Sequence, residues 1–214
     1  MRSFIASAAL LVSVAAIAQA QQQQPGASSS TSSSGAPVDI TSLQSGRYTV
    51  DAGHSLVNWT VSHLGITPYT GEFGNVSGEL NLDKANPSAS RVDVRIPINS
   101  VSVVSDGLAK HLMTADFFDI AKYPEARFTS TSVVADPARQ TAQITGQLTM
   151  HGVTRPVVLD TRLYGAGNNP MNKKASVGFE ATARIQRSQW GISTGVPGVG
   201  DAVDLRIIGA FERA

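Results

Sequence analysis

Apolar and polar side chains alternate with a period of two along much of the chain. The clearest segments are residues 91–98, 141–150, 176–185 and 203–212. In "RVDVRIPI" (91–98), the even positions are all valine or isoleucine, whereas the odd positions are arginine, aspartate and proline. Alternation of this kind predicts antiparallel strands with one apolar and one wetted face. Similar runs begin near Tyr48, Ser55, Glu72, Arg127 and Pro156.

One segment departs from this pattern. "SDGLAKHLMTADFFD" (105–119) predicts a short helix, with Ser105 or Asp106 as its N-cap. Eight or nine strands that each carry a single apolar face must hide that face, either in a sandwich or in a closed barrel. We therefore expect an all-β domain with one short helical insertion near residues 105–120.

Several positions on the predicted inner faces carry small side chains. A barrel of eight strands can just fill itself with side chains or hold one small ligand. Small inner residues leave room for a ligand, or they accommodate neighbouring aromatic rings, and the sequence leaves both alternatives open. These positions are Ala142, Gly146, Ala181, Ala183 and Gly209.

The beginning of the chain is not expected to belong to the domain. Residues 1–20 combine an early Arg2, an apolar run and a small-residue ending, which predicts a secretory signal peptide cleaved after Ala20. Residues 21–45 are rich in Gln and Ser and predict a disordered leader. Residues 46–214 then form one domain. The predicted location is the bacterial periplasm.

Composition excludes some classes of function. The chain has no cysteine, so it forms no disulfide and its stability must come from burial. Loss of Arg2 with the signal peptide leaves 16 basic and 16 acidic residues. Without a basic excess to neutralise phosphates, nucleic-acid binding is not expected.

The stretch "HLMTADFFDIAKYPEARF" (111–128) has two interpretations. His111, Asp116 and Asp119 could form an acid/base site. Alternatively, Phe117 and Phe118 point into the barrel as a plug, and the two aspartates accept backbone N–H groups of a short capped turn. We favour the plug, because carboxylates three residues apart on one turn lie side by side, whereas a glycosidase needs them across a cleft.

Other catalytic patterns are weak. "GISTG" (191–195) matches a nucleophile elbow, but the following "VPGVGD" cannot start a helix and no histidine follows His151. The four histidines lack the spacing of a zinc protease. A hydrolase or metal-dependent enzyme that uses rim histidines with Asp116 or Asp119 stays as the alternative function, and a scaffold with a filled core as a third.

Four collinear motifs resemble the YceI-like family. They are residues 53–80, which begin "GHSLVNWTVSH", residues 111–133, residues 146–160 with "GQLTMHGVTRPVVLD", and residues 178–192. The resemblance extends over nearly all of residues 48–212 in one order.

The resemblance implies a single lipocalin-like antiparallel β-barrel in the periplasm with no established enzymatic activity. It implies a bound polyisoprenoid or similar long-chain amphiphile, with an isoprenoid quinone as one candidate and no catalytic cofactor. It also implies a homodimer and a membrane cytochrome of the b561 type as a partner. The family commonly carries an Arg-Asp pair where this chain has Leu108 and Ala109, so a contact made by that pair is lost here.

A chain-shaped apolar ligand needs few polar partners. Each buried methylene contributes about 0.8 kcal/mol, so a dozen carbons offset most of the ~4–15 kcal/mol cost of association. Strand alternation and the helical insertion predict which residues form the wall of the cavity. Three histidines near the rims are candidate anchors for a lipid head group. The predicted ligand-binding residues are Val57, Trp59, Val61, Val94, Ile96, Ile98, Phe117, Phe118, Ile144, Leu148, Phe179, Ile185, Phe211, His54, His63 and His111.

Overall fold

The structure, a computed structural model, describes residues 39–214. The expected signal peptide and residues 21–38 of the expected leader lie outside the described residues. The strands are β1 (Gly46–Val50), β2 (Leu56–His63), β3 (Thr67–Phe73), β4 (Ser77–Leu82), β5 (Arg91–Pro97), β6 (Val101–Ser102), β7 (Glu125–Asp136), β8 (Thr141–Met150), β9 (Val153–Asn168), β10 (Ala175–Gln186) and β11 (Val199–Arg213). The helices are α1 (Asp106–Leu112) and the 3-10 turns η1 (Ile40–Ser42), η2 (Ala52–His54), η3 (Pro87–Ala89), η4 (Ile98–Ser100) and η5 (Arg187–Trp190).

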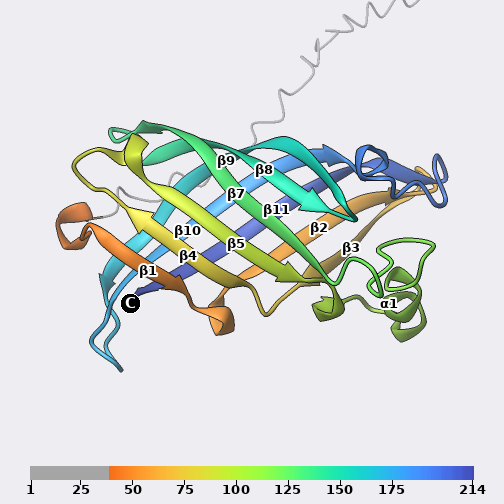
Figure 1. The fold of residues 1–214 in the computed structure, drawn as a ribbon, viewed down its shortest axis with the longest axis horizontal. Coiled ribbons are helices and arrows are strands. Elements are labelled where there is room, and N and C mark those ends of the chain that lie inside the picture. The colour runs from red at the N-terminus through yellow and green to blue at the C-terminus, as the bar shows by residue number, and fades with distance from the viewer. Residues whose placement is uncertain (1–38) are drawn as a thin grey trace, which may run out of the picture. The chain divides into compact units, whose positions relative to one another are not determined.

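Within residues 39–214 the strands close into an eight-stranded antiparallel barrel. The order is β1-β4-β5-β7-β8-β9-β10-β11, and β11 pairs back with β1. The other three strands extend barrel strands that are interrupted. β2 follows β1 along β11, β3 pairs with β2, and β6 pairs with β3. Figure 1 shows the strands winding around one long axis. The all-β prediction from alternation is confirmed, and so is the single antiparallel β-barrel that the family resemblance implies.

Alternation sets which residues face inward, as predicted. Phe179 of β10 lies opposite Gly209 of β11, and Ala181 lies opposite Ile207. The outward neighbours include Glu180, which bonds to arginines of the flanking strands. The predicted strand start near Glu72 is wrong, because β3 begins at Thr67. Residues 67–70 form one side of an exposed hairpin in which Tyr69 alone is partly buried, so no alternation marks a strand there.

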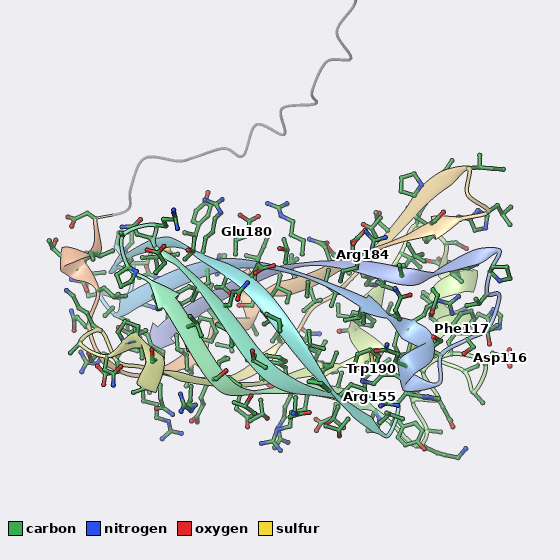
Figure 2. The ribbon with its side chains drawn as sticks, turned by 90° about the horizontal axis from the view of Figure 1, so that it is seen from above. Asp116, Phe117, Arg155, Glu180, Arg184 and Trp190 are labelled. Carbon is green, nitrogen blue, oxygen red and sulfur yellow. The ribbon has the colours of Figure 1, made fainter. Side chains whose placement is uncertain are left out.

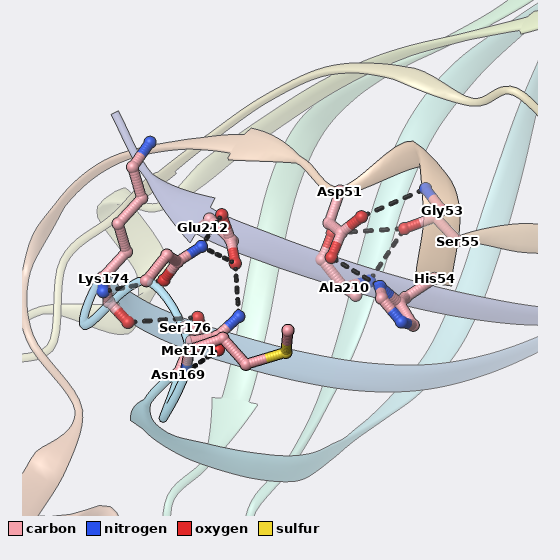
Figure 3. A network of polar contacts seen from close by, with 11 residues as sticks. Asp51, Gly53, His54, Ser55, Asn169, Met171, Lys174, Ser176, Ala210 and Glu212 are labelled. Atoms are coloured by element: carbon pink, nitrogen blue, oxygen red, sulfur yellow. Dashed lines mark hydrogen bonds and ion pairs between the residues drawn. The ribbon is translucent and has the colours of Figure 1, made fainter.

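Side-chain hydrogen bonds stabilise the interruption between β1 and β2. Asp51 accepts hydrogen bonds from the Gly53 amide at 3.0 Å and pairs with Nδ1 of His54 at 2.7 Å. The Ser55 hydroxyl donates to the carbonyl of Ala210 and accepts from its amide, at 3.1 and 2.9 Å. Figure 3 shows this cluster against β11. Backbone groups that lose strand pairing at the interruption, such as those of Gly53 and Ala210, therefore find side-chain hydrogen-bond partners nearby.

The helical insertion is shorter than the sequence pattern suggested. Ser105 is the N-cap of α1, and its side chain accepts from the Leu108 amide. The helix ends at Leu112, and turns carry the chain on to β7, with Asp119 at a positive φ of 47°. Asp116 and Asp119 therefore lie beyond the helix, although the insertion itself is where it was predicted.

The connections divide between two ends of the barrel. One end carries residues 64–66, 98–124, 151–152 and 187–198, including α1 and η5. The other end carries η1 and residues 83–90, 137–140 and 169–174. We call them the helix end and the hairpin end. Across residues 39–214, no helix is both long and apolar enough to cross a bilayer.

Candidate functional site

A cavity of about 410 Å³ occupies the barrel interior toward the hairpin end. Its volume falls within the roughly 300–1,000 Å³ of small-molecule pockets. The wall is built by side chains from nine strands, from β1 and β2 round to β11, and most of them are Val, Leu, Ile or Phe. The inward stripes that the sequence predicts thus enclose open space.

Several inward side chains are only half-buried although they point away from solvent. Val94, Ile144, Leu159 and Leu205 all line the cavity and are of this kind. In a tightly packed core such residues touch neighbours on all sides. Their remaining accessible surface therefore faces the cavity, and an apolar ligand there would complete their contacts.

Some of the small inner residues make room for aromatic rings, and others leave space for a ligand. A Cβ on Gly146 would lie 2.3 Å from the Phe128 ring, so this glycine makes room for an aromatic side chain. Ala142 and Ala181, in contrast, line the cavity directly. Ala183 packs against the buried cluster around Trp190. Small residues therefore widen the cavity only along part of the barrel.

Seven of the predicted wall residues line the cavity, and their contact with a ligand stays a prediction. They are Val57, Val94, Ile96, Ile144, Leu148, Phe179 and Phe211. Sequence reasoning missed other wall residues such as Leu80, Val133 and Leu159. The same alternation could have found them, because Leu159 shares its face with Val157, and Leu80 shares its face with Leu82.

The helix end of the barrel is filled instead. Val61, Ile98 and Ile185 belong to buried clusters there, and Trp59 and Phe118 pack against these clusters. None of the five is among the residues that line the described cavity. Figure 2 shows Trp190 at this end, far along the barrel from Glu180. These five predicted wall residues therefore lie in the packed helix end, which forms the floor of the cavity, and not around the cavity itself.

Two buried side chains, those of Trp190 and Arg187, stabilise this floor through hydrogen bonds to backbone carbonyls. Trp190 is 1% exposed, and its indole nitrogen donates to the Leu148 carbonyl at 3.1 Å. Arg187, which is 8% exposed, donates to the carbonyls of Gly200, Ile192 and Val199. Burial lowers the pKa of this guanidinium from its ordinary value, because desolvation disfavours the charged form. These bonds fix the β10–β11 connection across the end of the barrel.

Phe117 and Phe118, the predicted plug, point in different directions. Phe118 meets Phe73 edge to face with ring centroids 5.6 Å apart, inside a buried cluster. Phe117 instead packs on the exposed His111, 5.1 Å between centroids, and it does not line the cavity. The plug prediction is confirmed for Phe118, which joins the floor, and is wrong for Phe117, which packs against the exposed His111 instead.

The candidate acid/base residues form separate surface pairs. Nε2 of His111 lies 2.8 Å from Oδ2 of Asp116, with both side chains about half exposed. Asp119 accepts instead from Nζ of Lys122 at 2.8 Å. The carboxylates are therefore held by side chains, in place of the expected backbone amides. Both pairs lie outside the cavity and hold the turn beyond α1.

The histidines do not converge on one site. His54 lies in η2, His63 ends β2, His111 lies in α1, and His151 follows β8, with its Nδ1 bound to the carbonyl of Trp190. None of them lines the cavity. Within residues 39–214, no three histidine, aspartate or glutamate side chains gather to hold a metal ion.

The remaining motifs have structural partners at the helix end. The Thr194 hydroxyl of "GISTG" donates to the backbone carbonyl of Asp116, which ties the β10–β11 connection to the turn after α1. A turn, rather than a helix, follows this motif. Leu108 and Ala109, at the positions of the family's Arg-Asp pair, lie in α1 and do not line the cavity.

The rim of the cavity at the hairpin end is polar. Asp83 and Lys84 line it from the β4–β5 connection, Arg91 lines it from the start of β5, and Asp136 lines it from the end of β7. Nζ of Lys84 donates to the carbonyl of Ile40 at 3.0 Å, so it also holds η1 over the rim. Residues 39–45, which the sequence assigned to the leader, thus contribute to the cavity. Loop side chains carry no periodic pattern, and sequence reasoning missed them.

Paired charges lie on the outer face of the barrel around Glu180. Glu180 accepts from Arg162 at 2.9 and 2.6 Å and from Nε of Arg206 at 2.6 Å. These hydrogen bonds lower the pKa of the Glu180 carboxyl below its ordinary value. A groove beside them is lined by Arg184 and Asp204, which form a further ion pair. At these positions the outer wall is charged, whereas the inner wall of the same strands is mostly apolar.

Comparison with known proteins identifies relatives over the whole barrel. The YceI-like domain matches residues 48–211. Protein YceI of Escherichia coli O6:H1 is 41% identical over 154 residues, which cover 72% of this chain and 79% of that protein.

Two solved structures have the same architecture. The YCEI protein of Campylobacter jejuni superimposes with a TM-score of 0.63 at 30% identity, over 72% of this chain and 90% of that one. A polyisoprenoid binding domain from Saccharophagus degradans superimposes with a TM-score of 0.58 at 17% identity, over 78% and 98% of the two chains. The second likeness shows the fold alone.

Proposed function

The chain belongs to the YceI-like domain family, and from that premise we propose that it binds a long-chain isoprenoid or similar amphiphilic lipid inside its barrel without catalysing a reaction. The observation that carries this proposal is the apolar cavity of about 410 Å³ with half-buried aliphatic side chains facing its interior. A polyisoprenoid binding domain among the structural neighbours supports the chemical class.

The shape and lining of the cavity favour a chain-like ligand. Its wall along the barrel is mostly hydrocarbon, with Ser55 and Thr161 as polar exceptions, and its charged side chains gather at the rim. A tail buried in such a wall gains about 0.8 kcal/mol per methylene, and its head group can keep contact with water at the open end. We therefore place the tail inward and the head near Lys84 and Arg91.

This orientation revises the predicted anchors for the head group. His54, His63 and His111 lie outside the cavity, and the latter two are at the helix end. The charged side chains that border the cavity are those of the rim. We propose the rim as the place of the head group, with an isoprenoid quinone as one candidate ligand, and the periplasm as the site of action.

Native mass spectrometry followed by organic extraction tests the proposal. We expect the purified protein to carry a lipid with a long hydrocarbon chain, and the mass difference to disappear after extraction. A purified protein that neither retains nor takes up any isoprenoid or fatty amphiphile would contradict the proposal.

Filling the cavity provides a matched pair of variants. Ala142→Phe places a ring in the cavity, and we expect it to abolish lipid retention. Gln143→Phe places the same ring on the outer face of the same strand, and we expect lipid to be retained. Equal retention by both variants would show that the lipid lies elsewhere.

A further inference from the structure

The β9–β10 loop at the hairpin end holds an apolar side chain in water. Met171 is 91% exposed, in the sequence "NNPMNKK" (168–174). A single exposed apolar residue is common on a protein surface and needs no explanation by itself. This one differs because its loop is rigid, because two lysines follow it, and because the cavity opens at the same end of the barrel.

The rigidity comes from a polar network centred on Glu212 (Figure 3). The Glu212 carboxylate accepts from Nδ2 of Asn169 at 2.8 Å and from Nδ2 of Asn172 at 2.9 and 3.0 Å. Oδ1 of Asn169 accepts from the Met171 amide, and Oδ1 of Asn172 accepts from the Lys174 amide, both at 2.9 Å. The network fixes the loop backbone with the methionine facing outward, so the exposure is built into the loop.

Charge at this end complements an anionic surface. Lys173 and Lys174 follow Met171 after Asn172, and neither is in an ion pair among the described residues. The Lys173 ammonium donates to the carbonyl of Pro170 at 2.7 Å, which keeps this positive charge beside the loop tip. An apolar tip with adjacent cations matches the boundary between lipid head groups and acyl chains.

Further apolar side chains are exposed on the same end. Ile40 of η1 is 37% exposed and lines the cavity, so it lies at the opening itself. Val134 is 68% exposed and stands between Val133 and Ala135, both of which line the cavity. Tyr164, near the end of β9, is 69% exposed, and tyrosine is enriched where proteins meet the bilayer interface.

We infer that the hairpin end docks on an anionic phospholipid bilayer, led by Met171 with Lys173 and Lys174. This inference rests on the proposed lipid-binding function, because docking there would bring the open end of the cavity to the membrane. A lipid could then pass between the bilayer and the barrel without crossing bulk water. The partner is the lipid surface itself, and the contact is peripheral and reversible.

Vesicle co-sedimentation of the purified protein tests the inference. We expect binding to vesicles that contain phosphatidylglycerol and much weaker binding to vesicles of phosphatidylcholine alone. Lys173→Gln with Lys174→Gln should lower partitioning about 20-fold, since each lysine beside an anionic surface is worth roughly a factor of five. Met171→Asp should lower it by a similar factor.

The helix end supplies matched controls. Val104 is 95% exposed, and Lys110 is an exposed lysine of α1. Val104→Asp places the same carboxylate in an exposed apolar position at the far end, and Lys110→Gln removes one lysine there. We expect both to leave vesicle binding unchanged. Equal losses from changes at the two ends, or no binding of the wild-type protein to either vesicle, would overturn the inference.

Mass spectrometry of the bound lipid separates this inference from the proposed function. The Met171 and lysine variants should still retain lipid, because these residues do not line the cavity. A protein that holds lipid but never sediments with vesicles disproves docking and leaves lipid binding intact. A protein that sediments with vesicles but never holds lipid disproves the proposed function instead.

Discussion

The two halves of the barrel have the same strand pattern but different interiors. At the helix end, Trp190, Ile98 and Val61 are 1, 2 and 7% exposed, and aromatic and aliphatic side chains fill the space. Toward the hairpin end, inward residues such as Leu159 and Leu205 are only half-buried around a cavity. The comparison teaches that alternation defines a face, whereas the volumes of the side chains on that face decide whether it encloses a core or a binding site.

The halves should therefore contribute differently to stability and to binding. Truncation in the filled half removes contacts on all sides and leaves a new void, which adds to the lost transfer free energy. Truncation beside the existing cavity removes fewer contacts. Three truncation predictions, in order of decreasing effect on stability, test this difference, and a fourth concerns the charged outer wall.

Trp190→Ala should have the largest effect. The indole is almost fully buried and donates a hydrogen bond to Leu148, so we expect a loss of about 3–5 kcal/mol in the free energy of unfolding. Urea denaturation followed by circular dichroism measures it. Tyr164→Ala, on the exposed outer wall, is the control, with an expected change within about 0.5 kcal/mol. Similar losses in the two variants would show that the helix end is not a packed floor.

Phe118→Ala and Phe117→Ala compare neighbouring rings on the two sides of the floor. Phe118 packs on Phe73, and we expect its loss to destabilise the protein by about 2–3 kcal/mol. Phe117 contacts the exposed His111, and its loss should cost about 1 kcal/mol or less. Neither ring lines the cavity, so folded protein of both variants should retain lipid in native mass spectra. A variant that folds fully but loses lipid would place the ring in the binding site.

Leu159→Ala tests the hollow half. Leu159 lines the cavity and is half-buried, so we expect a cost of only about 1–2 kcal/mol, together with weaker lipid retention. Leu112→Ala is the matched control at the helix end, because Leu112 is 7% exposed. We expect a cost of about 2–5 kcal/mol there and unchanged lipid retention. The reverse order of stabilities would contradict the assignment of filled and hollow halves.

Acidification should have the smallest effect. Hydrogen bonds from Arg162 and Arg206 lower the pKa of Glu180 in the folded state, so this carboxylate stabilises the protein above its unfolded pKa of about 4.3. That contribution is lost as the pH falls through the lowered folded pKa. Melting temperatures of the wild type and Glu180→Gln should therefore differ at neutral pH and converge in acid. A difference that grows on acidification would contradict the assigned direction.

The sequence alone predicted most of the fold. Side chains on a strand alternate between its faces, so the apolar positions of residues 141–150 and 176–185 identified the inner wall before any contact was known. The short helix and its Ser105 cap were also predictable, since capping depends on residues close in sequence. The start of β3 was not, because residues 67–70 lie in an exposed hairpin with no buried face to mark it.

The site was only partly predictable. Seven of the predicted wall residues line the cavity, because alternation places them on the inner face. The sequence could not show that Val61 and Ile185 lie in the filled floor, or that Lys84 and Arg91 lie at the rim. A pattern along one strand carries no information on depth, which depends on neighbours from strands distant in the chain.

The sequence by itself determined an antiparallel β-domain with one apolar face and a short capped helix, because both follow from local periodicity. Periodicity left the sandwich and the barrel open, and the family resemblance predicted the barrel. Only the tertiary structure decided which half is hollow and which end is open. These properties depend on the summed volumes of side chains brought together from all the barrel strands and on loops such as residues 169–174. No single segment of the chain contains that information.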